Sequence, residues 1–327
     1  MNRNFNKPRI VASKCLGFSP CKYNGTMDSS EFIEELKKYV EFITVCPEVG
    51  IGMTTPRNII RLIEDREKNI VNLVQPSTGE NFTKFMVEFS EKFFKSLGDV
   101  DGFILKERSP SCGIKEVKIY NGRENAICVK KGKGVFGTIV TEKLGHLPIE
   151  DDGRLKDHNI RQHFLTRVFI MRDFREVEIK GSIQELFKFH EKNKLLFMAY
   201  SQKGFRSLRK ILKNQKKYEL EEIFNLYKKE LCNALQRAPR YTSNINALMK
   251  AMECFKDKME NEEYTYILEI IEKYRYNKVP FSNLLYLVRK SVIRFEEEKL
   301  LEQSFFKPYP KELEHLTKLE NSEIKYI

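Results

Sequence analysis

Phe103-Ile-Leu-Lys-Glu-Arg-Ser-Pro-Ser-Cys-Gly113 joins an apolar segment to a cysteine-bearing turn. It overlaps a short apolar run, Val100 to Leu105, that is typical of a buried β-strand. The run ends in a turn rich in serine and proline, which presents Cys112 between Ser111 and Gly113. The stretch therefore predicts a strand that delivers a cysteine at its carboxyl end.

Two earlier segments repeat this design. Ile10-Val-Ala-Ser-Lys-Cys-Leu-Gly17 and Phe42-Ile-Thr-Val-Cys-Pro-Glu48 each read as an apolar strand that runs into a cysteine beside glycine or proline. A predicted helix separates them, and this βαβ order favours parallel strands joined by a right-handed crossover. The carboxyl ends of neighbouring parallel strands face one crevice. We therefore expect Cys15, Cys46 and Cys112 to meet in a ligand-binding site.

The remaining elements of residues 1–155 complete a predicted α/β domain with a parallel, Rossmann-like sheet. They are a helix from residue 29 or 30, a β-ribbon over 59–74, a helix over 81–97, a strand over 117–120 and a helix opened by Gly132 to Gly137. The phenylalanines of 81–97 share one helical face and are predicted to be core. Residues 47–57 contain too much glycine and proline for a helix, and 147–155 reads as a linker. The glycine-rich turn at 132–137 is a candidate phosphate cradle, although it lacks the pyrophosphate-binding spacing.

Residues 156–327 are predicted to form an all-α domain. Helices are expected over 158–171 and 182–200, and near 203–214, 218–237, 243–259, 262–277 and 281–304. Ser182-Ile-Gln-Glu185 matches a capping box. His190 has no second histidine at metal-ligand spacing, so we interpret it as structural.

Length and composition set the class of protein. At 327 residues the chain is too long for one typical core, which favours two domains. With 41% apolar and 32% charged residues it is an ordinary folded protein. No apolar run approaches the roughly 20 residues of a membrane span, and the amino terminus has no signal-peptide core, so we expect no membrane partner and a cytoplasmic location. Cysteines there are reduced, which favours metal binding or catalysis over disulfides.

The net charge of +12 is uneven along the chain. Residues 1–155 hold 24 basic and 21 acidic residues, a net +3, whereas residues 156–327 hold 34 and 25, a net +9. A basic second half suggests a polyanionic partner, with nucleic acid first. Solubility alone is the alternative, because net charge determines partners only loosely.

Three clustered thiols restrict the chemistry of the site. Ligation by sulfur alone suits zinc or an iron–sulfur cluster. A structural zinc commonly uses two Cys-x-x-Cys pairs, and this chain has none. Three thiolates on a cubane would leave its fourth iron open to a substrate atom. Cys21 is a possible fourth ligand, although its spacing is unusual. For Cys128, Cys232 and Cys254 we expect small buried side chains without a chemical role.

The first half resembles the TudS-type thiouracil and thiouridine desulfidases over roughly residues 8–150. The motifs that carry this resemblance are Ser13-Lys-Cys15-Leu-Gly17, Tyr23-Asn-Gly25, Val45-Cys-Pro-Glu-Val-Gly-Ile-Gly52, Pro56-Arg57 and Lys106-Glu-Arg-Ser-Pro-Ser-Cys-Gly113. The resemblance implies a 4Fe-4S cluster on Cys15, Cys46 and Cys112, whose open iron takes the sulfur of a thiolated pyrimidine. Asn24 and Met53 depart from the family pattern, which usually has Asp and Leu there.

The resemblance also implies catalytic roles for Glu48 and Ser109, with Ser111 as the alternative serine. A thiocarbonyl carbon resists attack by water until its sulfur is drawn onto a soft Lewis acid. Glu48 would then take a proton from the attacking water, and Ser109 would hydrogen-bond the pyrimidine or relay a proton. Arg57 and Lys106 are candidate substrate-binding residues for a phosphate or another anionic group; the alternative is that both face water.

The second half resembles the YbgA-type helical domain over roughly residues 180–315. Phe189 to Ala199 and Gln303 to Pro310 carry this looser match. Fusions of the two domains resemble the RudS-type tRNA 4-thiouridine desulfidases, which implies tRNA as a partner of the basic helical domain. We therefore expect hydrolytic desulfuration of thiolated uracil, as 4-thiouridine in tRNA or its nucleoside, to give uridine and sulfide. The alternative is a cluster-containing protein that binds or senses nucleic acid without turnover; a zinc module comes third.

Overall fold

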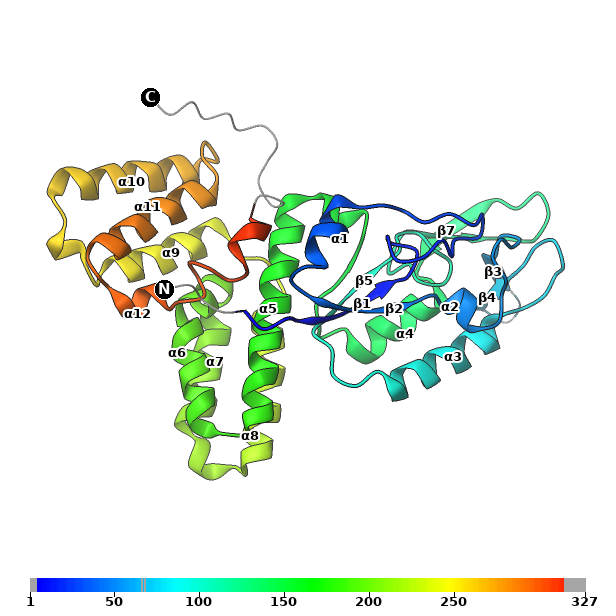
Figure 1. The fold of residues 1–327 in the computed structure, drawn as a ribbon, viewed down its shortest axis with the longest axis horizontal. Coiled ribbons are helices and arrows are strands. Elements are labelled where there is room, and N and C mark those ends of the chain that lie inside the picture. The colour runs from blue at the N-terminus through cyan, green and yellow to red at the C-terminus, as the bar shows by residue number, and fades with distance from the viewer. Residues whose placement is uncertain (1–4, 66, 68, 315–327) are drawn as a thin grey trace. The chain divides into compact units, whose positions relative to one another are not determined.

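The structure is a computed structural model that describes residues 5–65, 67 and 69–314 (Figure 1). The chain divides into two compact units. Among the described residues, the sheet unit comprises 6–172 and 310–314, and the helical unit comprises 173–309 and Phe5. The predicted domain boundary between residues 155 and 156 precedes helix α5 (His158–Lys180), whereas the two units divide within this helix.

The sheet unit is built on a four-stranded parallel sheet in the order β2-β1-β5-β8, which confirms the predicted α/β class. Its strands are β1 (Arg9–Ser13), β2 (Glu41–Val45), β5 (Gly102–Leu105) and β8 (Ile149–Asp151). Ser13 lies opposite Val45 and Ala12 lies opposite Ile104, so the first three strands end at nearly the same level. This register brings the loops that follow them to one edge.

Helices cover the two faces of this sheet. They are α1 (Glu31–Leu36), α3 (Thr83–Ser96), α4 (Val135–Leu144) and the first part of α5. Figure 1 shows α3 and α4 side by side, and the ring of Phe94 stacks on that of Phe136 at 5.8 Å between centroids. Val168 of α5 lies so close to Gly102 that a Cβ there would meet its side chain at 3.0 Å. Close packing on both faces fully buries Phe103 and Ile104.

A second sheet, in the order β4-β3-β6-β7, belongs to the same unit. Its strands are β3 (Arg61–Asp65), β4 (Ile70–Val74), β6 (Val117–Tyr120) and β7 (Cys128–Gly132). Strands β3 and β4 pair antiparallel, which confirms the ribbon predicted over 59–74.

Several details of the first half differ from the predictions. The segment 47–57 begins with one helical turn, α2 (Pro47–Gly50), because proline at the first position has the φ angle that a helix start requires. The predicted linker 147–155 contains β8, since Pro148 O accepts from the Phe103 amide at 2.9 Å and starts a fourth strand. Phe85 of the supposed core stripe is 51% exposed. Cys232 is buried as expected, but Cys128 and Cys254 are exposed.

The helical unit confirms the all-α prediction for the second half. After α5 it contains α6 (Ile183–Tyr200), α7 (Gln202–Lys213), α8 (Leu220–Ala234), α9 (Tyr241–Met252), α10 (Asn261–Arg275), α11 (Phe281–Arg294) and α12 (Glu298–Leu301). Short 3-10 turns lie at Gln215–Lys217 and Lys256–Lys258. The start of α6 differs from a capping box: the Ser182 hydroxyl donates to Gln184 Oε1 at 2.8 Å and caps no backbone amide.

His190 lies in the aromatic core of the helical unit, as its structural interpretation requires. Its side chain is 3% exposed, its Nδ1 lies 2.9 Å from the Tyr227 hydroxyl, and its ring stacks on Phe205 at 5.6 Å. Phe174 and Phe189 pack around the same tyrosine. The imidazole therefore fills a packed, hydrogen-bonded position.

The two segments that carry the resemblance of the second half contact each other. Gln303 Nε2 donates to Glu191 O at 2.7 Å, and Gln303 Oε1 accepts from the Leu195 amide at 3.2 Å. The Ser304 amide donates to Lys192 O at 3.0 Å, and its hydroxyl donates to Asn193 Oδ1. The segment after α12 thus clamps the middle of α6. Across the ranges that the structure describes, no helix combines the length and apolar character needed to span a bilayer.

Burial of His190 predicts acid sensitivity of the helical unit. Burial, followed by smaller effects of nearby charges, lowers its pKa from 6.5 to about 4. Between these two pH values the unfolded chain binds a proton that the folded chain does not, so stability falls as the pH decreases through this window. The full effect is about 3 kcal/mol. We expect the helical melting transition of the wild type, followed by circular dichroism, to drop more between pH 7 and pH 5 than that of His190→Asn; equal drops would contradict this assignment.

Candidate functional site

The strand register gathers the three predicted thiols at one rim of the parallel sheet. Cys15 lies two residues beyond β1, Cys46 directly follows β2, and Cys112 follows β5 through a short turn. Two hydrogen bonds join the strand ends: Lys14 N donates to Val45 O at 2.8 Å, and Lys106 N donates to the Ser13 hydroxyl at 2.9 Å.

Burial and the charges of neighbouring thiols raise the pKa of two of these thiols, those of Cys15 and Cys112. Burial, followed by the nearby thiols of Cys21 and Cys46, raises the pKa of Cys15 to about 12. Burial also raises the pKa of Cys112 well above its usual range; a hydrogen bond with Ser13 lowers it partly, and Cys15 raises it further. A bound cation reverses this balance, because a coordinating thiol loses its proton to the metal. The donor set therefore suits a positively charged metal group.

Each of the three predicted thiols comes from a separate strand end. Within the described ranges, no three His, Cys, Asp or Glu side chains converge closely enough to hold one metal ion. A structural zinc would need four ligands around one centre. In an iron–sulfur cubane each thiolate binds its own iron, so the sulfurs surround the group. Thiols delivered by three adjacent strands fit that requirement.

Cys21 lies close to the three thiols. It is buried, and its backbone carbonyl accepts from the Cys46 thiol at 3.9 Å. Burial, followed by the charge and hydrogen bond of Cys46, raises the pKa of Cys21 to about 12. Its carbonyl also accepts from Arg57 Nη2 at 3.0 Å. The Cys21 backbone therefore supports the Cys46 loop, whatever the role of its thiol.

Glu48 is fixed beside the thiols by two different partners. Its Oε1 accepts from the Ser111 hydroxyl at 2.5 Å, and its Oε2 accepts from Arg57 Nε at 2.8 Å and from Arg57 Nη2. The side chains of Arg57 and Glu48 are only 5% and 13% exposed. Two-point contact by guanidinium fixes the plane of a carboxylate, so Glu48 presents one oriented oxygen toward the Ser111 loop.

Both predicted serines lie in this network, at different positions. Ser109 Oγ accepts from the amides of Ser111 at 3.2 Å and Cys112 at 3.1 Å, and lies 3.0 Å from Ser111 Oγ. A hydroxyl has two acceptor positions and one proton. The Ser109 hydroxyl therefore donates to Ser111 Oγ, and the Ser111 hydroxyl donates to Glu48 Oε1. Ser111, 1% exposed, is the serine that contacts the carboxylate.

Arg57 and Lys106 are both engaged by the protein itself. Besides Glu48, the Arg57 guanidinium donates to Thr54 O at 3.2 Å and Thr55 Oγ1 at 3.1 Å.

Lys106 Nζ lies 2.5 Å from Asp152 Oδ2 and 3.2 Å from Asp28 Oδ2. Burial lowers the pKa of Lys106, but hydrogen bonds and charges of these aspartates raise it overall. The roles of Ser13, Asp28 and Asp152 were missed in the sequence because their partners are far apart along the chain.

The glycine-rich turn at 132–137 packs against the back of the Cys112 loop. Gly134 N donates to Gly113 O at 2.7 Å, and Gly137 N donates to Ser111 O at 3.0 Å. These amides are the groups with which a phosphate would have to bind. A Cβ at Gly134 would lie 2.4 Å from Ser111 O, and one at Gly137 would lie 2.4 Å from Gly113 O. The glycines thus permit close backbone packing, which explains their spacing better than a phosphate site.

The fold and the site thus define an α/β protein that places partly buried thiols and an ion-paired carboxylate at the carboxyl edge of its parallel sheet. The chain belongs to the 2-thiouracil desulfurase family, whose family model matches residues 10–152. The uncharacterized protein YbbK of Bacillus subtilis (strain 168) is 33% identical over 140 residues, which are 41% of this chain and 87% of that relative.

The second half and the solved structures give further matches. A family described as a protein of unknown function (DUF1722) matches residues 194–310. The uncharacterized protein YbgA of Escherichia coli (strain K12) is 22% identical over 149 residues, 45% of this chain and 88% of that relative. The [4Fe-4S]-dependent thiouracil desulfidase TudS is a solved structure with 26% identity that covers 46% of this chain and 93% of its own, at a TM-score of 0.35.

The packing of Gly134 predicts that the glycine turn holds the site in place. Gly134→Ala should lower the free energy of unfolding by about 1–3 kcal/mol, because its Cβ meets the backbone of the Ser111 loop. Gly122→Ala is the matched control, since a Cβ there meets nothing within 4 Å. Chemical denaturation of both variants measures the difference, and equal stability would show that the turn tolerates a side chain.

Proposed function

We propose that this chain is an iron–sulfur desulfidase that removes sulfur from thiolated uracil, as 4-thiouridine in tRNA or its nucleoside. Membership of the 2-thiouracil desulfurase family supports the reaction. The observation that carries the proposal is the placement of three strand-end cysteines at one rim of the parallel sheet, beside the oriented Glu48–Ser111 pair. Cys15, Cys46 and Cys112 would hold the 4Fe-4S cluster.

When bound, such a cluster supplies a soft Lewis acid for the thiocarbonyl sulfur. The balanced reaction is a hydrolysis. The carbon of the thiocarbonyl forms a bond to the oxygen of water, the carbon–sulfur bond breaks, and sulfur leaves as hydrosulfide. Carbon and sulfur keep their oxidation states, so no electron donor or acceptor is required.

Glu48 is the general base in this proposal. The hydroxyl chain from Ser109 through Ser111 ends at its Oε1, so Glu48 is the acceptor toward which the protons point. An oriented carboxylate can take a proton from the attacking water and return it to the departing sulfur. Ser111 holds a donor beside the carboxylate, and Ser109 fixes the turn that carries Cys112.

The ion pairs of Arg57 and Lys106 support positioning roles for both residues, where the sequence analysis expected substrate binding. Arg57 orients Glu48 and ties it to the Cys21 carbonyl. Lys106 links the end of β5 to Asp152 after β8 and to Asp28. A lysine held between two carboxylates has little charge left for a substrate phosphate.

An exposed basic stripe on α7 supports RNA as the partner. Its cations are exposed, and the structure gives none of them an ion pair within the described ranges: Lys203, Arg206, Arg209, Lys210 and Lys213, followed by Lys216 and Lys217. Leu208 and Leu212 bury the opposite face of the helix. A row of basic side chains without acidic partners on one helix can contact successive phosphates of a nucleic-acid backbone.

Turnover on defined substrates tests the function. Protein reconstituted with iron and sulfide without oxygen should convert 4-thiouridine, free or in tRNA, to uridine with one sulfide released per uridine formed. Iron retained without product from 4-thiouridine, thiolated tRNA or 2-thiouracil would favour the nucleic-acid-binding alternative. A colourless protein that carries zinc would reject both.

Substitutions should separate cluster binding from catalysis. Cys112→Ala should lose both iron and activity. Glu48→Gln should keep iron but lose about two to four orders of magnitude in kcat, because it removes the base alone. Cys21→Ala is the control that keeps both. Iron and sulfide assays on the purified proteins give the cluster content; loss of iron in Cys21→Ala would mean four protein ligands.

The α7 stripe predicts salt-dependent binding of tRNA. Replacing Lys203, Arg206 and Lys210 by alanine should weaken tRNA binding and reduce the slope of log Kd against log salt by about 2 to 3. Turnover of the free nucleoside should not change. Alanine at Lys273, Lys278 and Lys290 removes the same charge elsewhere in the helical unit and is the matched control. Equal effects of the two triple variants on filter-binding curves would show that net charge, and not the stripe, attracts the RNA.

A further inference from the structure

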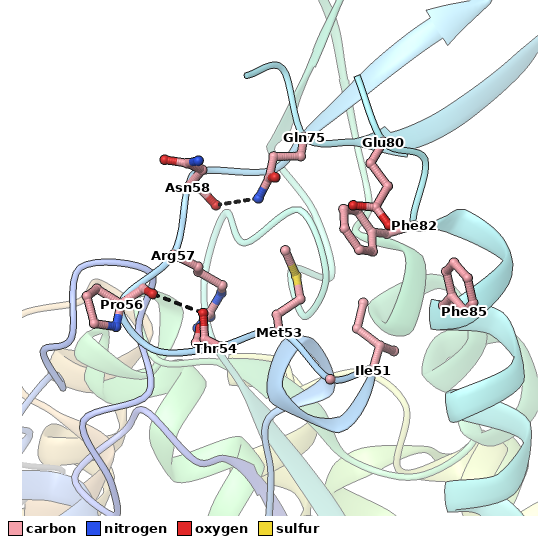
Figure 2. A pocket seen from close by; sticks show the side chains of 11 residues that line it. Ile51, Met53, Thr54, Pro56, Arg57, Asn58, Gln75, Glu80, Phe82 and Phe85 are labelled. Atoms are coloured by element: carbon pink, nitrogen blue, oxygen red, sulfur yellow. Dashed lines mark hydrogen bonds between the residues drawn. The ribbon is translucent and has the colours of Figure 1, made fainter. Parts of the chain in front are cut away.

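A cavity in the sheet unit lies next to the Glu48–Arg57 pair. Its volume is about 750 Å³, within the range of sites that hold a nucleotide-sized ligand. Figure 2 shows Met53 between Arg57 on one side and Phe82 and Phe85 on the other. The walls come from the loop after α2, the turn after β4 and the start of α3.

The packing beneath the cavity fixes two of its walls. A Cβ at Gly50 would lie 2.2 Å from the ring of Phe89, so α2 packs directly on α3. Gln75 is 8% exposed and bridges the other walls: its Nε2 donates to Asn58 O at 3.4 Å, and its Oε1 accepts from Thr78 Oγ1 at 3.0 Å. The cavity is therefore preformed.

The aromatic wall suits a flat ligand. Phe82 is buried, but Phe85 is 51% exposed although it lies on the apolar stripe of α3. The two ring centroids are 6.4 Å apart. Nucleobases bind proteins by stacking on exposed aromatic side chains of this kind.

The polar groups of the cavity select a neutral ligand with N–H donors. Among the described residues, the side chains of Asn58 and Glu80 make no hydrogen bond or ion pair. A carboxylate only accepts hydrogen bonds, whereas the Asn58 amide both donates and accepts. The free Glu80 carboxylate repels phosphate, and the Arg57 guanidinium is already bound to Glu48. The edge of a nucleobase provides the complementary donors.

The cavity adjoins the proposed reaction site through Arg57. Arg57 lines it and also contacts Glu48, and Ile51 to Met53 continue directly from the helical turn that carries Glu48. A nucleotide joined to a uridine at Glu48 would thus have its base within reach of Phe85.

We propose that this cavity binds the base of the nucleotide adjoining the thiolated uridine, by stacking on Phe85 and by hydrogen bonds to Glu80 and Asn58. The inference rests on the proposed function, because it assumes that the reacting uridine lies beside Glu48. It assigns to the sheet unit a preference for a polynucleotide over a free nucleoside.

Trinucleotides test the subsite. The probe is guanosine–4-thiouridine–guanosine, compared with versions in which one guanine, on the 5′ or the 3′ side, is replaced by an abasic sugar. One of the two abasic trinucleotides should bind the cluster-free wild type about tenfold more weakly than the intact trinucleotide does. Fluorescence anisotropy, with a dye-labelled uridine analogue as the reporter, measures both affinities. The reconstituted enzyme should show the same ratio in kcat/KM for sulfide release.

Phe85→Ala and Glu80→Ala should remove this difference and leave turnover of free 4-thiouridine unchanged. Glu88→Ala, which removes an exposed carboxylate of α3, and Ile127→Ala, which removes another exposed apolar side chain, should keep it. The inference is overturned if neither abasic position matters, or if Phe85→Ala and Glu80→Ala slow the free nucleoside equally. An affinity difference that persists while no substrate releases sulfide supports the subsite and refutes the desulfidase.

Discussion

Parallel pairing of β1 with β2 and β5 is the constraint on which the site depends. With Ser13 opposite Val45 and Ala12 opposite Ile104, three loops leave the sheet at one level, and each carries a cysteine. Side chains alternate between the faces of a sheet, so a shift of one residue in this register would move every side chain of the strand to the opposite face. The Ser13 hydroxyl, which accepts from the Lys106 amide, extends the pairing beyond the last paired residues of β1 and β5.

Much of this arrangement could be predicted from the sequence, because the information is local. Apolar runs that end in cysteine beside glycine or proline identified the strands and the thiols. The Ser13, Cys46 and Cys112 motifs also identified the family. Helices of the second half followed from their apolar spacing. These features depend on residues that are close together along the chain.

What the sequence did not reveal depends on contacts between distant residues. The short strand β8 forms because Pro148 reaches Phe103, and nothing within 147–155 alone indicates this pairing. The turn at 132–137 has the composition of a phosphate loop, yet its amides bind the Ser111 loop. Ser111 could not be preferred over Ser109 until the position of Glu48 was known. Phe85 belongs to an apolar stripe by spacing, but its side chain is exposed although the next residue, Met86, is fully buried.

The clamp of Gln303 and Ser304 on α6 has a consequence for synthesis on the ribosome. Helix α6 emerges more than a hundred residues before the segment that satisfies the Leu195 amide and the Asn193 side chain. Until that segment is synthesised, these polar groups lack their protein partners and hydrogen-bond to water instead. The nascent helical unit therefore stays incompletely packed until Ser304 has left the exit tunnel, whereas β1, β2 and β5 can pair much earlier.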